Sequence, residues 1–471
     1  MPVRGASCRT VGPLRVGIPQ LGHPIYRRIL LAPWQEGTET PIIPVPFDRP
    51  DFLSPYATGG LVRNWRRSLW AVLLLPIALG SLSVAAENEP FRLKDGDRVV
   101  FLGNTFVERA QLYGEIERLM TTRFAEARIT FRNLGWSGDT VFADSRGIFD
   151  PPAVGYQRML EQLAELKPTV VFLAYGANEA FAGEQGLSAY VKQFRTLRGD
   201  IAKLGSRMVV LSPILQQKRP RPLPDPTTHN VILAVYSRAM HTVCLETGDL
   251  FVDLLAPWTP SNAETATSEL YDPNGLHLSR TGYQAVAERI EQALWPSKLA
   301  WTLHLSADGT VVISQGVTAT PDGNADIAAG RWSWELVDDR LEDWRRTTRP
   351  RQLRISNLPA GRYALSADGI VLATATAEEW DSGQITFASS ADQKQSEALR
   401  QAIISKNQLY FYSWRPQNVT YLFGFRKHEQ GQNAAEIAQF APLIASAETR
   451  IGQLARPQSR RYALVSVKER P

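Results

Sequence analysis

Five short strand-like runs alternate with helical patterns between residues 91 and 298. The first run, residues 99–102, is wholly apolar, which is typical of a parallel strand that helices cover on both faces. This alternation predicts a three-layer α/β/α domain built around a parallel sheet and spanning residues 91–298. The other runs are 129–133, 169–174, 208–211 and 250–253, and the helical patterns are 108–124, 156–166, 187–204, 230–246 and 279–294.

Short blocks of polar residues and glycine follow the ends of three predicted strands. Thr105 comes after the first strand and a tight turn at Gly103, Gly138 follows the second strand, and Asn178 follows the third. His277 precedes the last helix. Because open parallel sheets place their ligands at the carboxyl ends of the strands, we expect these residues at one edge of the sheet. A helix that starts near Thr105 also offers free backbone N–H groups to a developing negative charge.

Each of these residues also has a purely structural interpretation. Thr105-x-x-Glu108 fits a capping box, in which the hydroxyl and the carboxylate bond backbone N–H groups at the start of a helix. Gly138 and Asn178 fit ordinary turns, and His277 fits a buried core histidine. The order of all these residues along the chain favours the functional interpretation.

Four short blocks, in register with the predicted strands, resemble those of the SGNH (GDSL-like) hydrolase family. The family has Gly-Asp-Ser in the first block, a Gly in the second, Gly-x-Asn-Asp in the third and Asp-x-x-His in the last. The resemblance covers roughly residues 91–298 and implies an SGNH/flavodoxin-like fold. The matching blocks here are Gly103-Asn104-Thr105, Gly135–Thr140, Tyr175–Glu179 and Asp272–His277.

The resemblance implies a role for each matched residue. Thr105 is the nucleophile, and His277 is the general base that later protonates the leaving group. Asn274 orients the His277 ring. The backbone N–H of Gly138 and the side-chain amide of Asn178 form the oxyanion hole with the Thr105 N–H. Acyl transfer needs these three components: a nucleophile, a base within reach and preorganised donors.

Several matched positions depart from the family pattern. Thr105 replaces Ser, and its methyl group stiffens χ1 and crowds the path of attack. Asn274 replaces the Asp that would orient the imidazole, and a neutral amide does not stabilise an imidazolium charge. Asn104 replaces the Asp of Gly-Asp-Ser. Asn104 and Asp272 are candidate auxiliary residues, with Asp272 a substitute acid for the histidine.

The chain is therefore expected to be an exported hydrolase of acyl esters. Acetyl groups on carbohydrates are a candidate substrate class, implied by the resemblance and by the expected location. The alternative is a catalytically inactive SGNH fold that binds a glycan or a protein through its cleft and its β-rich region.

Charge and cysteine content exclude other classes of protein. The formal net charge is +5, but residues 1–86 hold nine Arg, no Lys and four acidic residues, so the rest of the chain is balanced. That balance gives no electrostatic basis for nucleic-acid binding. Cys8 and Cys244 cannot build a disulfide framework or a zinc site, and His428-Glu429 lacks H-E-x-x-H spacing. With no glycine-rich phosphate loop or dinucleotide fingerprint either, we expect no metal, no cofactor and a small-molecule or glycan ester as the partner.

Residues 1–86 have the organisation of an export signal with an extension before it. Residues 61–86 contain a basic region, an apolar run and small residues, in the order of a signal peptide. Residues 1–60 are rich in Pro, Gly and Arg and are expected to be a disordered or misannotated leader, with translation starting near Leu61 or Val62. The apolar run is short for a stable membrane span, and an uncleaved anchor is the alternative. A periplasmic or extracellular location follows.

Residues 299–395 show strict alternation and predict a small β-rich domain. Asp-Gly pairs at 308–309 and 368–369 each separate two alternating runs, which predicts hairpins. The tryptophans of this region are either core residues or exposed faces for sugar rings: Trp332, Trp334, Trp344 and Trp380.

Residues 396–471 predict a C-terminal α+β segment. Residues 397–405 and 434–454 have helical patterns, and residues 409–412 are expected to form a short strand. We expect this aromatic, Arg-rich segment to pack on the first domain and to shape the entrance of the site.

Overall fold

The computed structural model describes residues 91–255, 269–295, 301–322, 326, 329–341, 351–385 and 390–467. These residues all belong to one compact unit, Ser83–Pro471. The predicted leader, the predicted signal peptide and Trp344 lie outside the described residues. Within the described part, no helix has both the length and the apolar character to cross a membrane.

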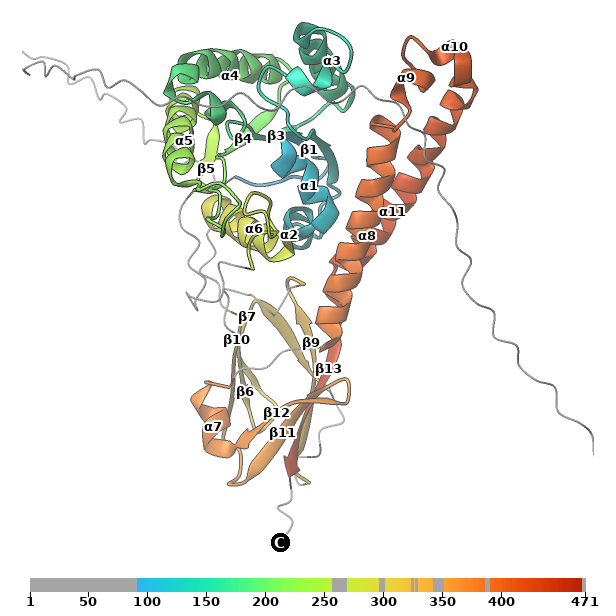
Figure 1. Ribbon diagram of the computed structural model, residues 1–471. Helices are drawn as coiled ribbons and strands as arrows, with labels where there is room; N and C mark the ends of the chain where they lie inside the picture. The colour runs from blue at the N-terminus through green and yellow to red at the C-terminus, as the bar shows by residue number, and fades with distance from the viewer. Residues whose placement is uncertain are drawn as a thin grey trace, which may run out of the picture. The chain divides into compact units, whose positions relative to one another are not determined.

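The first domain is built on a parallel five-stranded sheet with the order β2-β1-β3-β4-β5, and this confirms the predicted architecture (Figure 1). This is a flavodoxin-like order, in which ligands bind at the carboxyl ends of the strands. The strands are β1 (Arg98–Gly103), β2 (Thr130–Gly135), β3 (Val170–Ala174), β4 (Arg207–Leu211) and β5 (Leu250–Val252).

Two hydrophobic cores cover the two faces of this sheet. Val100 and Leu102 face one core, which takes most of its helical side chains from α3, α4 and α5 and adds Tyr410 and Ile444 from the C-terminal segment. Val99 and Phe101 face the other core, which is formed with α1, α2 and α6. Successive side chains of β1 therefore point to opposite faces of the sheet, and both faces are buried. The helices are α1 (Thr105–Tyr113), α2 (Glu115–Arg123), α3 (Pro152–Glu165), α4 (Leu187–Ala202), α5 (Thr227–Thr247) and α6 (Arg280–Leu294).

The single helix expected over residues 108–124 is divided at Gly114. Gly114 has φ 70°, a left-handed conformation that ends α1 and starts α2. A Cβ built on Gly114 would lie 3.2 Å from the side chain of Ile403 in the C-terminal helix α8 (Ser390–Trp414). The break therefore lets α8 approach the first domain closely.

The β-rich region consists of two sheets, with strand orders β10-β6-β7 and β12-β11-β13-β9-β8. Both predicted hairpins are confirmed, β6–β7 and β11–β12 being antiparallel. Trp332, Trp334 and Trp380 are buried in the core, so the sugar-stacking interpretation of these three is wrong. The strands are β6 (Trp301–Ser306), β7 (Val311–Gln315), β8 (Val317–Pro321), β9 (Arg331–Asp338), β10 (Arg351–Ser356), β11 (Arg362–Ala367), β12 (Ile370–Thr376) and β13 (Arg460–Val467), and helix α7 (Ala377–Ser382) follows β12.

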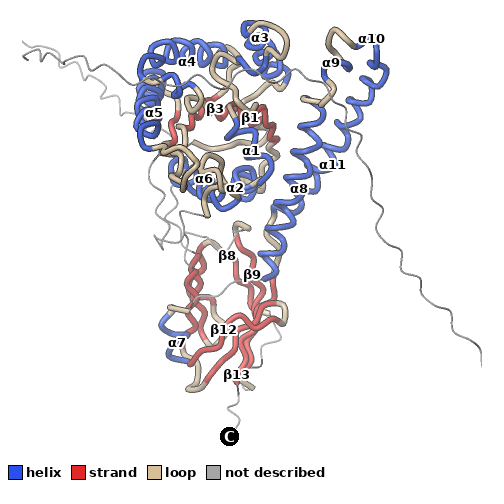
Figure 2. Tube along the Cα trace, in the orientation of Figure 1, coloured by secondary structure: helices blue, strands red, loops and turns tan. Residues whose placement is uncertain are grey.

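The C-terminal segment is mainly helical, and its last strand joins the β-rich region. Residues 409–412 lie inside α8, so the predicted strand there is wrong. Tyr410 is buried, and the guanidinium of Arg132 lies 5.2 Å from its ring centre. This packing keeps an aromatic run helical despite its strand preference. After α8 come α9 (Val419–Leu422), α10 (Lys427–Gln430), a 3₁₀ helix (Gly431–Gln439) and α11 (Phe440–Ala455), which lies beside α8 (Figure 2). The chain then forms β13, between β11 and β9.

Helix α8 contacts α1, α2 and β2 of the first domain, and buried charges lie in the contact. Lys406 Nζ lies 2.8 Å from a carboxylate oxygen of Glu117 and donates to the carbonyl of Phe131 at 3.1 Å. Asn407 donates to the same Glu117 carboxylate at 3.1 Å. These contacts place one face of α8 against the first domain, beside the helix that begins with Thr105.

Candidate active site

Thr105 is the first residue of α1 and its hydroxyl does not cap the helix. Asn104 is the N-cap residue, since its Oδ1 accepts the Phe106 N–H at 3.0 Å. Thr105 Oγ1 instead accepts the N–H of Gly138, at 3.0 Å, from the loop after β2. The capping-box interpretation of Thr105 and Glu108 is therefore wrong. Asn104, a candidate auxiliary residue in the sequence, instead caps the helix. Thr105 lies where the end of β1 meets the next loop.

The 136–140 loop places Gly138 beside Thr105. Gly138 has φ 76°, a conformation that side-chain-bearing residues rarely adopt. The N–H of the preceding residue, Ser137, donates to Glu108 Oε2 at 2.6 Å. Two consecutive backbone donors are thus held by two side chains of α1, Thr105 and Glu108.

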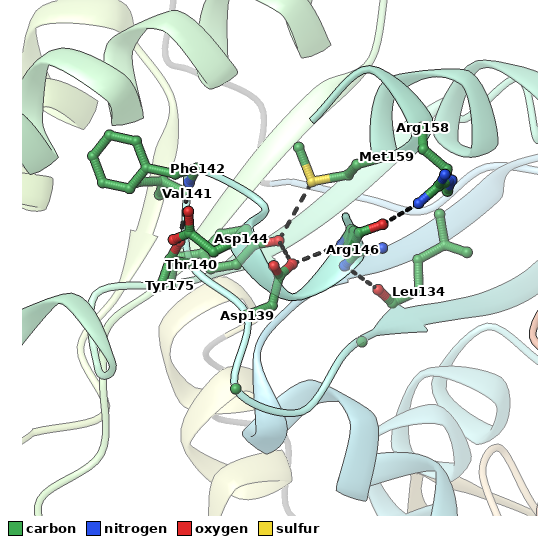
Figure 3. Close-up of polar contacts among 12 residues, drawn as sticks. Leu134, Asp139, Thr140, Val141, Phe142, Asp144, Arg146, Arg158, Met159 and Tyr175 are labelled. Carbon is green, nitrogen blue, oxygen red and sulfur yellow. Dashed lines mark hydrogen bonds and ion pairs between the residues drawn. The ribbon is translucent and has the colours of Figure 1, made fainter. Parts of the chain in front are cut away.

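A buried ion pair fixes the far side of this loop (Figure 3). Arg146 Nε lies 2.7 Å from Asp139 Oδ2, and both side chains are wholly buried. The Tyr175 hydroxyl donates to the same carboxylate at 2.8 Å, and Arg146 donates to the Leu134 carbonyl at 2.8 Å. Burial raises the pKa of Asp139, while Arg146 and Tyr175 act in the opposite direction. These buried, hydrogen-bonded contacts therefore hold the 136–140 loop in one conformation.

Asn178 and Glu179 attach the loop after β3 to the same region. Asn178 Nδ2 donates to the carbonyl of Asp139 at 2.7 Å, which leaves the second amide hydrogen available to a ligand. Glu179 accepts the N–H groups of Val141 and Gly176, both at 2.8 Å. Burial raises the pKa of Glu179 to about 7, against the opposing effect of these hydrogen bonds. Glu179 stands where the family pattern has Asp, and its role in joining two loops was not predicted.

Asn274 fixes the ring of His277. Asn274 Nδ2 lies 3.0 Å from His277 Nδ1, while Oδ1 accepts the N–H groups of Leu276 and His277 at 3.0 and 3.1 Å. Two backbone donors on Oδ1 assign the amide orientation, so the NH₂ group faces the ring. Nδ1 is then the acceptor and the ring proton lies on Nε2.

Asp272 does not take the place of the missing acid. Its carboxylate pairs with Arg109 at 2.6 Å instead of bonding the imidazole. Burial and the charge of Arg109 lower the pKa of His277, and the charge of Asp272 opposes them. His277 is consequently a neutral ring at pH 7.

Thr105 and His277 line one cavity of about 440 Å³, here called the Thr105 cavity. Ser137 and polar residues of α1 and α8 also line it, so the C-terminal segment forms one wall. Within the described residues no hydrogen bond joins Thr105 Oγ1 to the imidazole directly. Proton transfer between them therefore needs a rearrangement that brings the two groups within hydrogen-bond distance. The α8 side of the cavity consists of Ile404, Gln408, Phe411, Tyr412 and Gln417, the last just beyond the helix.

Arg415 extends this wall to the 136–140 loop. Its Nη1 lies 2.7 Å from Glu108 Oε2, the oxygen that accepts the Ser137 N–H. Its guanidinium carbon lies 3.7 Å from the centre of a Trp136 ring. Arg415 thus contacts the 136–140 loop in two ways. It stacks on Trp136, which precedes Ser137, and it pairs with Glu108, which accepts the Ser137 N–H. Sequence patterns gave no signal for this contact, because 307 positions separate the two charged residues.

The comparisons with known proteins agree with the fold of the first domain. Residues 101–285 match the GDSL-like Lipase/Acylhydrolase family, and no curated protein matches the sequence. A gut microbial diltiazem-metabolizing enzyme shares the fold over 80% of this chain and 99% of its own, with a TM-score of 0.62 and 17% identity. An acetylxylan esterase from Geobacillus stearothermophilus aligns over 44% of this chain and 97% of its own, with a TM-score of 0.35 and 18% identity. Residues 101–285 thus form a domain of the GDSL-like lipase/acylhydrolase family, the SGNH hydrolases.

Proposed function

We propose that this protein hydrolyses acyl esters with Thr105 as the nucleophile. The observation that carries the proposal is the meeting of three groups at one sheet edge. Thr105 Oγ1 accepts the Gly138 N–H, and Thr105 shares its cavity with the His277 ring. Family membership supports the same reaction type.

In the proposed reaction Thr105 Oγ1 bonds to the acyl carbon and its proton passes to His277 Nε2. The carbonyl oxygen becomes an oxyanion, which the N–H groups of Thr105 and Gly138 and the free amide hydrogen of Asn178 stabilise. When the intermediate collapses, the alcohol leaves with the proton from His277. Water, deprotonated by the same ring, then releases the acid and restores the Thr105 hydroxyl.

Asn274 makes this first proton transfer difficult. His277 Nε2 can accept a proton only if the ring hydrogen moves to Nδ1, which must then face an oxygen. Turning the Asn274 amide gives up two hydrogen bonds from backbone N–H groups, at a cost of about 1–3 kcal/mol. The proposed enzyme is therefore slow compared with an SGNH hydrolase that has Asp at this position.

For the substrate we propose a short acyl ester on a polar alcohol, with acetylated carbohydrate as the candidate class. Support comes from four polar side chains that line the Thr105 cavity beside its apolar residues, namely Arg109, Gln111, Gln408 and Gln417. An exported location, which the sequence of residues 61–86 favours, would give access to such polymers.

The orientation of Asn274 favours a second candidate function. A ring locked with its hydrogen on Nε2 donates a hydrogen bond toward the cavity instead of accepting a proton. The same domain would then bind an ester-bearing glycan without turnover.

Hydrolysis of p-nitrophenyl acetate by the wild type, Thr105→Ala and Thr105→Ser distinguishes these functions. A covalent mechanism requires that Thr105→Ala lose the wild-type rate, while Thr105→Ser keeps or raises it. Equal rates in wild type and Thr105→Ala would refute Thr105 as the nucleophile. Activity in Thr105→Ser alone would support the binding function.

A further inference from the structure

A second cavity, of about 300 Å³, lies at the end of α8 and is here called the aromatic cavity. Trp136 and Trp414 form part of it, with ring centres 5.9 Å apart in an edge-on arrangement. Phe149 and Phe425 meet at its rim with ring centres 6.0 Å apart. These two phenylalanines are 76% and 71% exposed, unusually high for rings in contact. Apolar rings exposed around a concave site indicate a binding surface.

One further feature distinguishes this cavity from an ordinary gap between side chains. Ile148, in the lining, has φ 61°, which strains a β-branched residue. Such strain is concentrated at functional sites.

The aromatic cavity adjoins the Thr105 cavity at two consecutive residues. Trp136 lines the aromatic cavity, and Ser137 lines the Thr105 cavity. Arg415 lines the aromatic cavity and also holds Glu108, whose carboxylate fixes the Ser137 N–H. A group bound against Trp136 and Arg415 therefore touches the same residues that position the oxyanion donors.

We propose that the aromatic cavity binds a planar aromatic ring of the substrate while the ester reacts at Thr105. This inference rests on the proposed ester-hydrolase function. The exposed rings of Phe149 and Phe425 favour an aromatic ring over an alkyl group of the same size, because ring edges and faces attract one another. The volume suits a single ring with its substituents.

Equilibrium binding to the Thr105→Ala variant tests the proposal without any turnover. Calorimetric titration with 2-phenylethyl acetate and with 2-cyclohexylethyl acetate compares two acetyl esters of nearly equal size. We expect the phenyl ester to bind about tenfold more tightly, because only it makes ring–ring contacts. Adding Phe149→Leu and Phe425→Leu together should remove about this advantage and leave the affinity for the cyclohexyl ester unchanged.

Phe181→Leu is the matched control, because Phe181 is also highly exposed but lines neither cavity among the described residues. Equal affinity for the two esters, or an equal loss in the Phe181→Leu control, would overturn the proposal. So would sedimentation of the wild type with phosphatidylcholine vesicles that Phe149→Leu/Phe425→Leu abolishes, since the rings would then serve a membrane surface. Selective binding together with no hydrolysis by the wild type would refute the proposed function and leave the subsite standing.

Discussion

The side-chain nitrogen of Asn274 lies 3.0 Å from Nδ1 of His277, and this contact places the ring proton on the catalytically unfavourable nitrogen. An Asp in the same place would accept a hydrogen bond from an Nδ1–H group with one of its oxygens. Its other oxygen would still accept the N–H groups of Leu276 and His277. Replacing the NH₂ group of Asn274 by an oxygen would therefore favour the His277 tautomer with its proton on Nδ1 over the tautomer with its proton on Nε2.

Asn274→Asp should raise kcat for p-nitrophenyl acetate by at least about 100-fold. In a serine-protease triad the reverse change, from Asp to Asn, lowers kcat by about 10,000-fold because the imidazole is held in the wrong tautomer. Stopped-flow release of p-nitrophenol measures the effect. The double variant Thr105→Ala/Asn274→Asp is the control and should show no gain. An unchanged kcat in Asn274→Asp would contradict the assigned tautomer.

Arg415 is predicted to position the 136–140 loop through Glu108. Arg415→Lys keeps a positive charge but loses the stack on Trp136, so the Ser137 and Gly138 N–H groups become less well fixed. We expect kcat for p-nitrophenyl acetate to fall about tenfold, with KM changing less than about twofold, since the loss falls on the transition state.

A matched control for this effect lies in the same segment. Arg426 also lies over a ring, that of Tyr421 at 4.5 Å, and pairs with Glu429 at 2.6 Å. Arg426→Lys should leave both kinetic constants unchanged, because these contacts do not reach the 136–140 loop. A rise in KM alone in Arg415→Lys would assign Arg415 to substrate binding instead.

The pH dependence of kcat/KM should report the environment of His277. Burial and Arg109 lower the pKa of this ring, so the neutral base persists below pH 6.5 and the acid limb lies below that value. Arg109→Gln removes a positive charge and frees Asp272, which shifts the limb to higher pH. Asp272→Asn removes the opposing negative charge, and the limb should move to lower pH. Shifts in the same direction would exclude His277 as the titrating base.

Stability should fall as pH rises from about 4.5 to about 7 because of Glu179. Its pKa is raised from 4.5 to about 7 in the folded state, so the folded protein holds a proton that the unfolded chain releases in this window. The loss is on the order of 3 kcal/mol when complete. Urea denaturation at pH 5 and pH 7.5 measures it. In Glu179→Gln the difference between the two pH values should shrink by about this amount, and an unchanged difference would contradict the assignment.

Sequence patterns predicted the first domain because buried parallel strands are encoded by continuous apolar runs, which are easy to recognise in a sequence. The apolar run before Thr105 and the helical spacing between runs are both short-range features, and the sheet follows from them. The break at Gly114 was missed, because a glycine within a helical pattern does not reveal that α8 approaches it. Residues 409–412 were mispredicted for a related reason. Their aromatic side chains favour a strand locally, but packing of Tyr410 on the first domain maintains the helix.

The site was predicted as a set of residues but not as a set of contacts. The blocks that hold Thr105 and Gly138 followed from the strand ends, whereas the family resemblance identified His277 and the role of each residue. The direction of the Asn274 amide depends on two backbone N–H groups, and no residue type specifies it. The contact of Glu108 with Arg415 joins distant parts of the chain, whereas the local pattern assigned Glu108 to a helix cap.

Lys406 and Glu117 provide a test of how α8 is held on the first domain. Lys406 is almost wholly buried, and its ammonium group lies 2.8 Å from the Glu117 carboxylate. Burial lowers the pKa of Lys406 and Glu117 opposes that shift, so the charge persists only because it is paired. Lys406→Met leaves a buried carboxylate without its cation and should lower the free energy of unfolding by about 3–5 kcal/mol.

The double variant Lys406→Met/Glu117→Gln should recover most of this loss, because no charge is then buried alone, and Asn407 can still donate to the amide oxygen. Guanidinium denaturation gives the four free energies of the cycle. Lys203→Met is the control, since Lys203 pairs with Asp200 on the surface and should contribute less than about 1 kcal/mol. Strictly additive losses in the double variant would show that the two charges act independently. The contact between α8 and α2 would then depend on its apolar side chains. The buried ion pair would not be required to hold α8 beside the Thr105 cavity.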